Sequence, residues 1–87
     1  MPTNSASLPE VVLYTRAGCH LCEEAKEQIR SAQTDTPFAF REVDIDLDPE
    51  LRARFNEEVP VIFIDGKKAF KYRLDLRAFR KRLKNRE

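Results

Sequence analysis

The two cysteines of the chain, Cys19 and Cys22, form a Cys-X-X-Cys motif. Residues three positions apart in a helix are neighbours, so the second sulfur can attack a mixed disulfide formed on the first. If a helix begins at Cys19, its sulfur lies where unpaired backbone N–H groups and the helix dipole favour an anion. Such sites lower a thiol pKa from about 8.5 to roughly 3.5–7.5, so Cys19 is expected to be a nucleophile at neutral pH.

A strand and a helix are predicted on the two sides of this motif. The run from Val11 to Thr15 is apolar and β-branched, which is typical of a buried central strand. Gly18 then provides a turn, and a helix is predicted from Cys19 to about Ser31. Cys22 is expected to face the core and Cys19 to lie at the exposed tip. The apolar stripe of this helix consists of Cys22, Ala25, Ile29 and Ala32.

The middle of the chain predicts a second strand and a short second helix. Pro37 breaks the first helix, and the strand-forming residues 38–45 follow it. Asp48 has the position of an N-cap, with Pro49 as the first helical residue of a helix that ends near Asn56. The expected order to this point is strand, helix, strand, helix.

The last third of the chain predicts a hairpin and a basic helix. The apolar run of residues 59–64 is followed by Asp65-Gly66, a two-residue hairpin signal. The return strand, residues 67–72, is expected to place Lys68 and Phe70 on one face, and its lysines indicate a sheet edge. A final helix capped by Asp75 is expected to bury Leu76, Phe79 and Leu83 and to expose Arg77, Arg80, Lys81, Arg82, Lys84 and Arg86.

The segment Tyr14-Thr15-Arg16, followed by Cys19 and Cys22, resembles the active-site strand, turn and Cys-X-X-Cys of glutaredoxins in the thioredoxin superfamily. The resemblance implies an α/β minimal thioredoxin fold, β-α-β-α-β-β-α, with a four-stranded mixed sheet flanked by helices. In this arrangement the first and third strands are expected to be parallel neighbours and the fourth an antiparallel edge strand. Residues 1–9 are expected to form a flexible tail and residues 10–87 a single domain.

The resemblance also implies roles for individual residues. Cys19 would attack a substrate disulfide and Cys22 would resolve the intermediate, as in a protein-disulfide reductase. Arg16 falls on a basic position of the family, where it would lower the thiol pKa or contact a substrate carboxylate, and the alternative is an ordinary exposed arginine. Val59 would offer its backbone groups to an extended substrate, and the Val59–Pro60 bond is expected to be cis.

His20 lies between the cysteines and is counted, with Arg16, Val59 and Pro60, among the expected substrate-binding residues. A cationic imidazole there would stabilise the thiolate and make the disulfide more oxidising. The alternative is a solvated histidine with little electrostatic effect. The sequence favours neither reading.

Two departures from the glutaredoxin pattern concern glutathione. Glu58 replaces the threonine that usually precedes Val-Pro, and its carboxylate would repel a carboxylate of glutathione. The Gly-Gly pair that normally precedes the last helix is absent from residues 71–74. We therefore expect disulfide-containing protein substrates, with either glutathione or thioredoxin reductase as the electron donor. No cofactor beyond the two sulfurs is expected.

The composition limits the partners of the chain. Its 16 basic and 15 acidic residues give a net charge of +1, which favours neither nucleic acid nor a membrane surface as a partner. Residues 67–87 hold ten basic and two acidic residues, typical of a solvated face. Residues 1–9 lack signal-peptide features, and no apolar run approaches the roughly 20 residues needed to cross a bilayer. A cytoplasmic monomer with a role in electron transport and redox homeostasis is expected.

Two other functions remain as alternatives. A structural zinc site needs four Cys or His ligands, and Cys19, Cys22 and His20 do not fill one, so no metal site is expected within one chain. An iron–sulfur cluster or metal held by Cys19 and a partner chain is the first alternative. The second is a redox-inactive adaptor that binds partners through Val59-Pro60 and the basic final helix.

Overall fold

The computed structural model describes residues 8–84 and contains the seven predicted helices and strands in the predicted order, with one additional 3-10 turn. Most of the predicted tail, residues 1–7, and Arg86 lie outside the described residues. Pro9 is buried, and its carbonyl accepts a 2.9 Å hydrogen bond from Ala39. The elements are β1 (Glu10–Thr15), α1 (His20–Gln33), β2 (Ala39–Asp44), η2 (Ile45–Leu47), α2 (Pro49–Phe55), β3 (Val61–Ile64), β4 (Lys67–Lys71) and α3 (Leu76–Lys84).

The four strands form one mixed sheet in the order β2-β1-β3-β4. β1 is parallel to β2 but antiparallel to β3, so the expected parallel pairing of the first and third strands is wrong. The register explains the direction. Thr15 at the end of β1 pairs with Asp44 at the end of β2, and Val61 at the start of β3 pairs with Tyr14. Because α2 has only seven residues and does not cross the sheet, β3 begins where β1 and β2 end and runs back.

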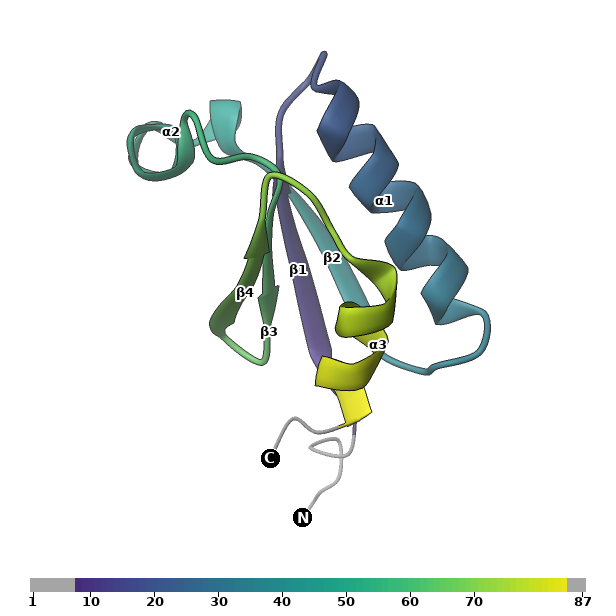
Figure 1. Cartoon of the computed structure of the whole chain (residues 1–87). Coiled ribbons are helices and arrows are strands. Elements are labelled where there is room, and N and C mark those ends of the chain that lie inside the picture. The colour runs from purple at the N-terminus through teal and green to yellow at the C-terminus, as the bar shows by residue number, and fades with distance from the viewer. Residues whose placement is uncertain (1–7, 85–87) are drawn as a thin grey trace.

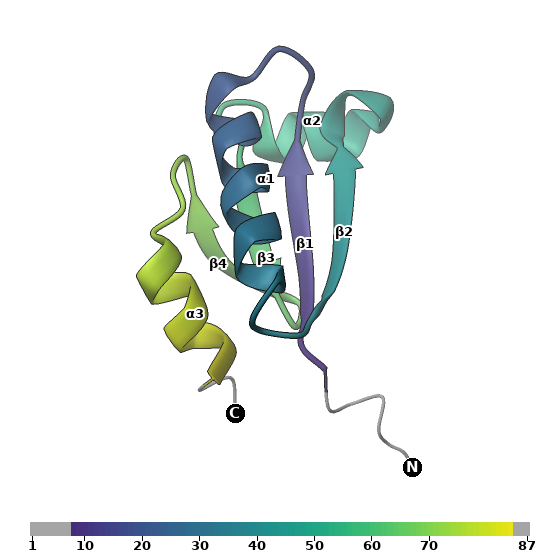
Figure 2. The same cartoon turned by 90° about the vertical axis from the view of Figure 1, so that its right-hand side faces the viewer.

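The helices form layers on the two faces of the sheet (Figures 1 and 2). α1 and α3 lie against one face, and α2 lies on the other, near the end of the sheet where β1 and β2 finish. Each face has its own core. The core under α1 and α3 includes Leu13, Ile29 and Phe79, whereas the core under α2 is formed by Ile45, Phe55 and Val61. Packing on both faces fixes the end of β1 and, with it, the first turn of α1.

The hairpin between β3 and β4 confirms its sequence signal, but β4 does not alternate as expected. Asp65 and Gly66 both have positive φ, 52° and 84°, as the favoured two-residue hairpin turn requires. A bulge then shifts the register, because Ile62 pairs with Phe70 whereas Phe63 pairs with Lys68.

This bulge leaves Ala69 without a partner and separates two side chains that were expected on one face. The Phe70 ring lies 6.3 Å from that of Phe79, in the core under α3. Lys68 Nζ lies 5.8 Å from the ring centroid of Phe55, in the core under α2. The two side chains therefore belong to opposite faces of the sheet.

The predicted helix caps are confirmed. Asp48 accepts a 2.9 Å hydrogen bond from the Glu50 amide, and Asp75 accepts one of 3.0 Å from the Arg77 amide. Arg80 was expected to be solvated but is partly buried, with Nη2 3.3 Å from a carboxylate oxygen of Asp35 beyond α1. No helix within residues 8–84 has the length and apolar character needed to span a membrane.

Candidate active site

Cys19 and Cys22 form a disulfide at the start of α1. Their Cα atoms are 5.2 Å apart, within the usual range for a disulfide. Cys19 is the N-cap residue, with extended φ and ψ of −93° and 109°, and α1 begins at His20. Cys22 is only 1% exposed, whereas Cys19 is partly exposed. The expected burial of Cys22 is confirmed; Cys19 is the more accessible of the two cysteines but only partly exposed, and their chemical roles remain predictions.

The backbone around Cys19 places its sulfur at the positive end of the helix. The Cys22 amide donates a 3.1 Å hydrogen bond to Cys19 Sγ, and the Glu23 amide donates one of 3.2 Å to the Cys19 carbonyl. Gly18, at a φ of 77°, makes the turn that brings the chain from β1 to this position. Amide dipoles therefore point at the sulfur where a thiolate would form on reduction, although the Glu23 carboxylate in the first turn acts against an anion.

The Val59–Pro60 segment lies at the same end of the sheet as this loop. The Val59–Pro60 bond is cis, as expected, and Pro60 is buried. The Pro60 carbonyl accepts a 2.8 Å hydrogen bond from the Tyr72 amide. Within the part of the chain that the structure describes, the N–H and C=O of Val59 have no hydrogen-bond partner. Val59 can therefore pair with an added extended segment, and this use remains a prediction.

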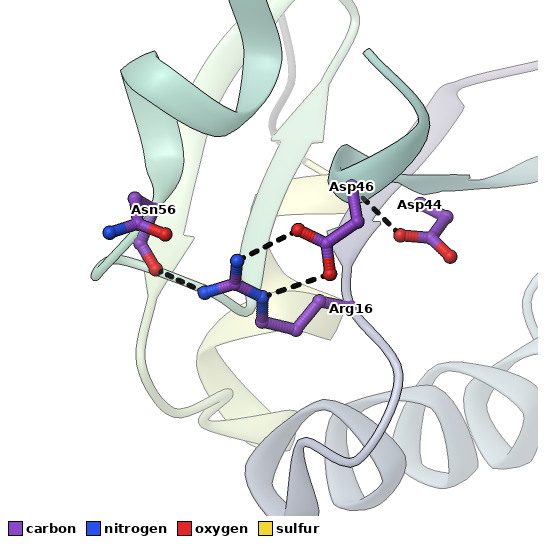
Figure 3. A network of polar contacts seen from close by, with 4 residues as sticks. All are labelled: Arg16, Asp44, Asp46 and Asn56. Atoms are coloured by element: carbon purple, nitrogen blue, oxygen red, sulfur yellow. Dashed lines mark hydrogen bonds and ion pairs between the residues drawn. The ribbon is translucent and has the colours of Figure 1, made fainter. Parts of the chain in front are cut away.

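Arg16 directs its guanidinium to residues that follow β2 and α2 (Figure 3). Nε and Nη2 donate to the Asp46 carboxylate at 3.3 and 2.8 Å, and Nη1 donates to the Asn56 carbonyl at 2.9 Å. The hydrogen bond with Asp46 raises the pKa of Arg16, and the same bond lowers the pKa of Asp46. The sequence predicts that Arg16 contacts the substrate, and this remains a prediction.

Sequence reasoning missed Asp46 and Asn56 as partners of Arg16. One signal was available for Asp46. Arg16 follows the first strand and Asp46 follows the second, and residues that follow neighbouring parallel strands meet at one edge of a sheet. No local sequence signal connects Arg16 to the Asn56 carbonyl, because 40 residues separate them.

His20 points along the helix surface. Its Nε2 lies 2.9 Å from the Glu24 carboxylate, one turn further along α1, and its side chain is 85% exposed. A carboxylate that close compensates the charge of a protonated imidazole, which reduces the charge available to the neighbouring thiolate. The predicted contact of His20 with a substrate remains a prediction.

Glu58, the first departure from the glutaredoxin pattern, is paired with Lys68 across 3.1 Å. The hydrogen bond from Lys68 is the main cause of a lowered pKa for Glu58. The carboxylate is therefore ionised and balanced by a cation, which weakens the repulsion expected toward an anionic substrate. Among residues 8–84, no cluster of three or more His, Cys, Asp or Glu side chains is arranged to hold a metal ion.

Tyr72, in the second departure, was not singled out by sequence reasoning. It has a positive φ of 70°, is 46% exposed, and lines a small hollow of about 100 Å³ with Leu21 and Glu24 of α1. Tyrosine rarely adopts this backbone conformation, which a glycine would adopt without strain. The chain thus has Tyr72 at a left-handed backbone position within residues 71–74, a segment that contains no glycine.

Comparisons with known proteins find a matching family and proteins of similar sequence and structure. A family profile described as "Glutaredoxin-like domain (DUF836)" matches residues 10–84. Uncharacterized protein Rv0508 of Mycobacterium tuberculosis is 34% identical over an alignment of 74 residues, and the match covers 79% of this chain and 76% of that protein. Protein Ne2328 of Nitrosomonas europaea, solved by NMR, is 32% identical with a TM-score of 0.77, over 94% of this chain and 99% of that one.

A more distant likeness shows the fold. Thioredoxin of Fasciola hepatica is 20% identical with a TM-score of 0.64, over 92% of this chain and 82% of that one. The fold is therefore the minimal thioredoxin fold that the sequence predicts, with a four-stranded mixed sheet flanked by three helices.

Proposed function

The chain belongs to the glutaredoxin-like domain family, and from this premise we propose that it is a thiol–disulfide oxidoreductase that reduces protein disulfides. The observation that carries the proposal is the position of Cys19 Sγ at the N-cap of α1, with a second, buried sulfur bonded to it. A cysteine sulfur at a helix N-terminus loses its proton at a lower pH than a free cysteine, so more of it is present as the reactive thiolate.

In the first step, the thiolate of Cys19 attacks one sulfur of a substrate disulfide. A bond forms between Cys19 Sγ and that sulfur, the substrate S–S bond breaks, and the other substrate sulfur leaves as a thiolate. Cys19 is the attacking residue because its side chain is accessible, whereas Cys22 is only 1% exposed. The product of this step is a mixed disulfide on Cys19.

In the second step, Cys22 attacks Cys19 Sγ as a thiolate and displaces the remaining substrate sulfur. The substrate leaves with both sulfurs reduced, and the enzyme holds the Cys19–Cys22 disulfide, so two electrons pass to the substrate. The Cα separation of 5.2 Å supports this step, because it lets the sulfur of the N-cap residue Cys19 and that of Cys22 in the first turn of α1 reach one another. Either two molecules of glutathione, which leave as oxidised glutathione, or thioredoxin reductase then supplies two electrons and restores the dithiol.

The substrate is held as an added extended segment beside Val59. The unpartnered N–H and C=O of Val59 would form main-chain hydrogen bonds with it, which recognise an extended peptide more than its side chains. Val61, two residues later, pairs with Tyr14 at the end of β1, so such a segment would run close to the loop that carries Cys19. This arrangement supports a protein substrate.

The test uses the two single serine variants, which are matched controls for one another. With a disulfide-containing protein as substrate, Cys22→Ser should accumulate a mixed disulfide on Cys19, seen as a mass increase that a reductant removes. Cys19→Ser should accumulate none and should have no reductase activity. Equal trapping by both variants would contradict the assigned roles, and no turnover of the wild-type protein with either donor would contradict the activity.

The donor is identified by two coupled assays of the wild-type protein. One supplies glutathione and glutathione reductase, and the other supplies thioredoxin reductase, each followed by the consumption of NADPH. The side chains of residues 71–74, which stand where glutaredoxins usually have a Gly-Gly pair, lead us to expect activity with thioredoxin reductase to exceed that with glutathione. A faster rate with glutathione would overturn this order.

A further inference from the structure

The loop between β1 and α1 determines where Cys19 lies. Ala17 and Gly18 are exposed, and neither has a side chain that can form a hydrogen bond. Arg16, the first residue of the loop, is therefore the residue whose side chain can tie the loop to the rest of the fold. Its side chain is only 28% exposed, which is low for an arginine on a loop.

The guanidinium of Arg16 reaches two separate parts of the chain (Figure 3). Nε and Nη2 hold the two carboxylate oxygens of Asp46 in η2, and Nη1 holds the carbonyl of Asn56, directly after α2. Three donors in the fixed plane of one guanidinium restrict both the position and the orientation of the side chain. The loop is thereby joined to both ends of the helical segment on the second face of the sheet.

Asp46 is itself held by Asp44, which lies beside the end of β1 where the loop begins. The Asp46 amide donates a 2.9 Å hydrogen bond to the Asp44 carboxylate (Figure 3). Asp44 pairs with Thr15 between the parallel strands β1 and β2, and Thr15 directly precedes Arg16. The carboxylate that receives the guanidinium is thus fixed relative to the end of β1.

The charge of Arg16 is compensated inside this network. Its pKa is raised by Asp46, and the pKa of Asp46 is lowered by Arg16, so each favours the charged form of the other. Within residues 8–84, no hydrogen bond or ion pair joins Arg16 to Cys19. The Cys22 amide of α1, by contrast, does donate a hydrogen bond to Cys19 Sγ.

We infer that Arg16 is a positioning residue, which acts through Asp46 and Asn56 to hold Cys19 Sγ at the N-cap of α1, and is neither a charge partner of the thiolate nor a substrate contact. The inference deepens the proposed function, on which it rests for the use of the thiolate. It is tested on the isolated protein without any substrate, so a failure of the reductase assays would leave this test intact.

The decisive variant is Arg16→Lys, which keeps the positive charge but removes the planar guanidinium and its several hydrogen-bond donors. It is compared with Arg16→Gln and Asp46→Asn, and with Arg30→Lys in the last turn of α1 as the matched control. The pKa of Cys19 is measured in a Cys22→Ser background from the rate of alkylation by iodoacetamide as a function of pH. Amide hydrogen exchange of residues 17–22 is measured in the same proteins.

We expect Arg16→Lys, Arg16→Gln and Asp46→Asn each to raise the Cys19 pKa by about half a unit to one unit. Each should also accelerate amide exchange in residues 17–22 at least about threefold, because the loop opens more often. The Arg30→Lys control should match the parent protein. Circular dichroism verifies the fold, and if Arg16→Gln does not fold, the two more conservative variants carry the test.

Three results would overturn the inference. A wild-type Cys19 pKa in Arg16→Lys, together with a raised one in Arg16→Gln, would show that Arg16 acts by charge. A Cys19 pKa lowered in Asp46→Asn would show that a released guanidinium stabilises the thiolate. Unchanged pKa values and exchange rates in all three variants would exclude a positioning role as well.

Discussion

The backbone N–H of Cys22 donates a 3.1 Å hydrogen bond to the sulfur of Cys19, so the first cysteine of the motif is the N-cap of α1. One sulfur therefore has two functions. It satisfies a helix amide that would otherwise lack a partner, and it lies where amide dipoles favour a thiolate. The stability of α1 and the reactivity of the thiol are linked through this contact.

This link predicts that serine and alanine at position 19 differ in stability. In a Cys22→Ser background, which removes the disulfide from both proteins, Cys19→Ser should unfold at a higher urea concentration than Cys19→Ala. The expected difference is about 1 kcal/mol, because serine caps a helix and alanine cannot. Equal unfolding free energies would show that the side chain at position 19 does not contribute as a cap.

Gly18 and Gly66 provide a matched pair of backbone positions, with φ of 77° and 84° and open space where a Cβ would lie. Replacement of either by alanine should cost about 1 kcal/mol of unfolding free energy through backbone strain alone. Only Gly18→Ala should also change the rate at which reduced Cys19 is alkylated, because Gly18 precedes that residue. A changed alkylation rate in Gly66→Ala, at the hairpin, would contradict this local explanation.

The Glu58–Lys68 pair predicts a stability difference that depends on pH. Lys68 lowers the pKa of Glu58 in the folded protein, so the folded state binds fewer protons than the unfolded state as acid is added. The stabilisation is complete above the unfolded pKa of Glu58 and is lost as the pH falls through its lower folded pKa. Lys68→Met should therefore unfold at lower urea than the wild type at neutral pH.

The same comparison in acid is the internal control. Below the folded pKa of Glu58, the ion pair no longer contributes, so the difference in urea midpoint between Lys68→Met and the wild type should shrink to the contribution of the lost contact between Lys68 Nζ and the Phe55 ring. Lys67→Met, one residue earlier on β4, is the matched variant and should show no such convergence. A gap between Lys68→Met and the wild type that is as large in acid as at neutral pH would mean that the ion pair is not its cause.

Local sequence signals predicted the elements and their caps. Asp48 before Pro49 and Asp75 before Leu76 mark helix starts, because a side-chain oxygen there satisfies the first amides of the helix. Asp65-Gly66 marks the hairpin, since both residues must adopt positive φ. These interactions join residues a few positions apart, so the sequence contains both partners side by side.

Two features of the fold could not be predicted in this way. The antiparallel direction of β3 relative to β1 follows from the shortness of α2 and from the end of the sheet at which it lies. The bulge at Ala69 reassigns Lys68 and Phe70 to opposite faces, because Phe70 fills the core under α3. Each outcome depends on how separate elements pack and not on the pattern of one segment.

By itself, the sequence determined the Cys-X-X-Cys at a strand-to-helix turn, with Cys22 on the apolar stripe and Cys19 off it, since helical periodicity fixes which residues share a face. Only the tertiary structure decided what Arg16 does. Its partners, Asp46 and Asn56, lie 30 and 40 residues away. They meet it because two parallel strands end together and a short helix returns the chain to the same edge of the sheet, a consequence of packing that no local pattern contains.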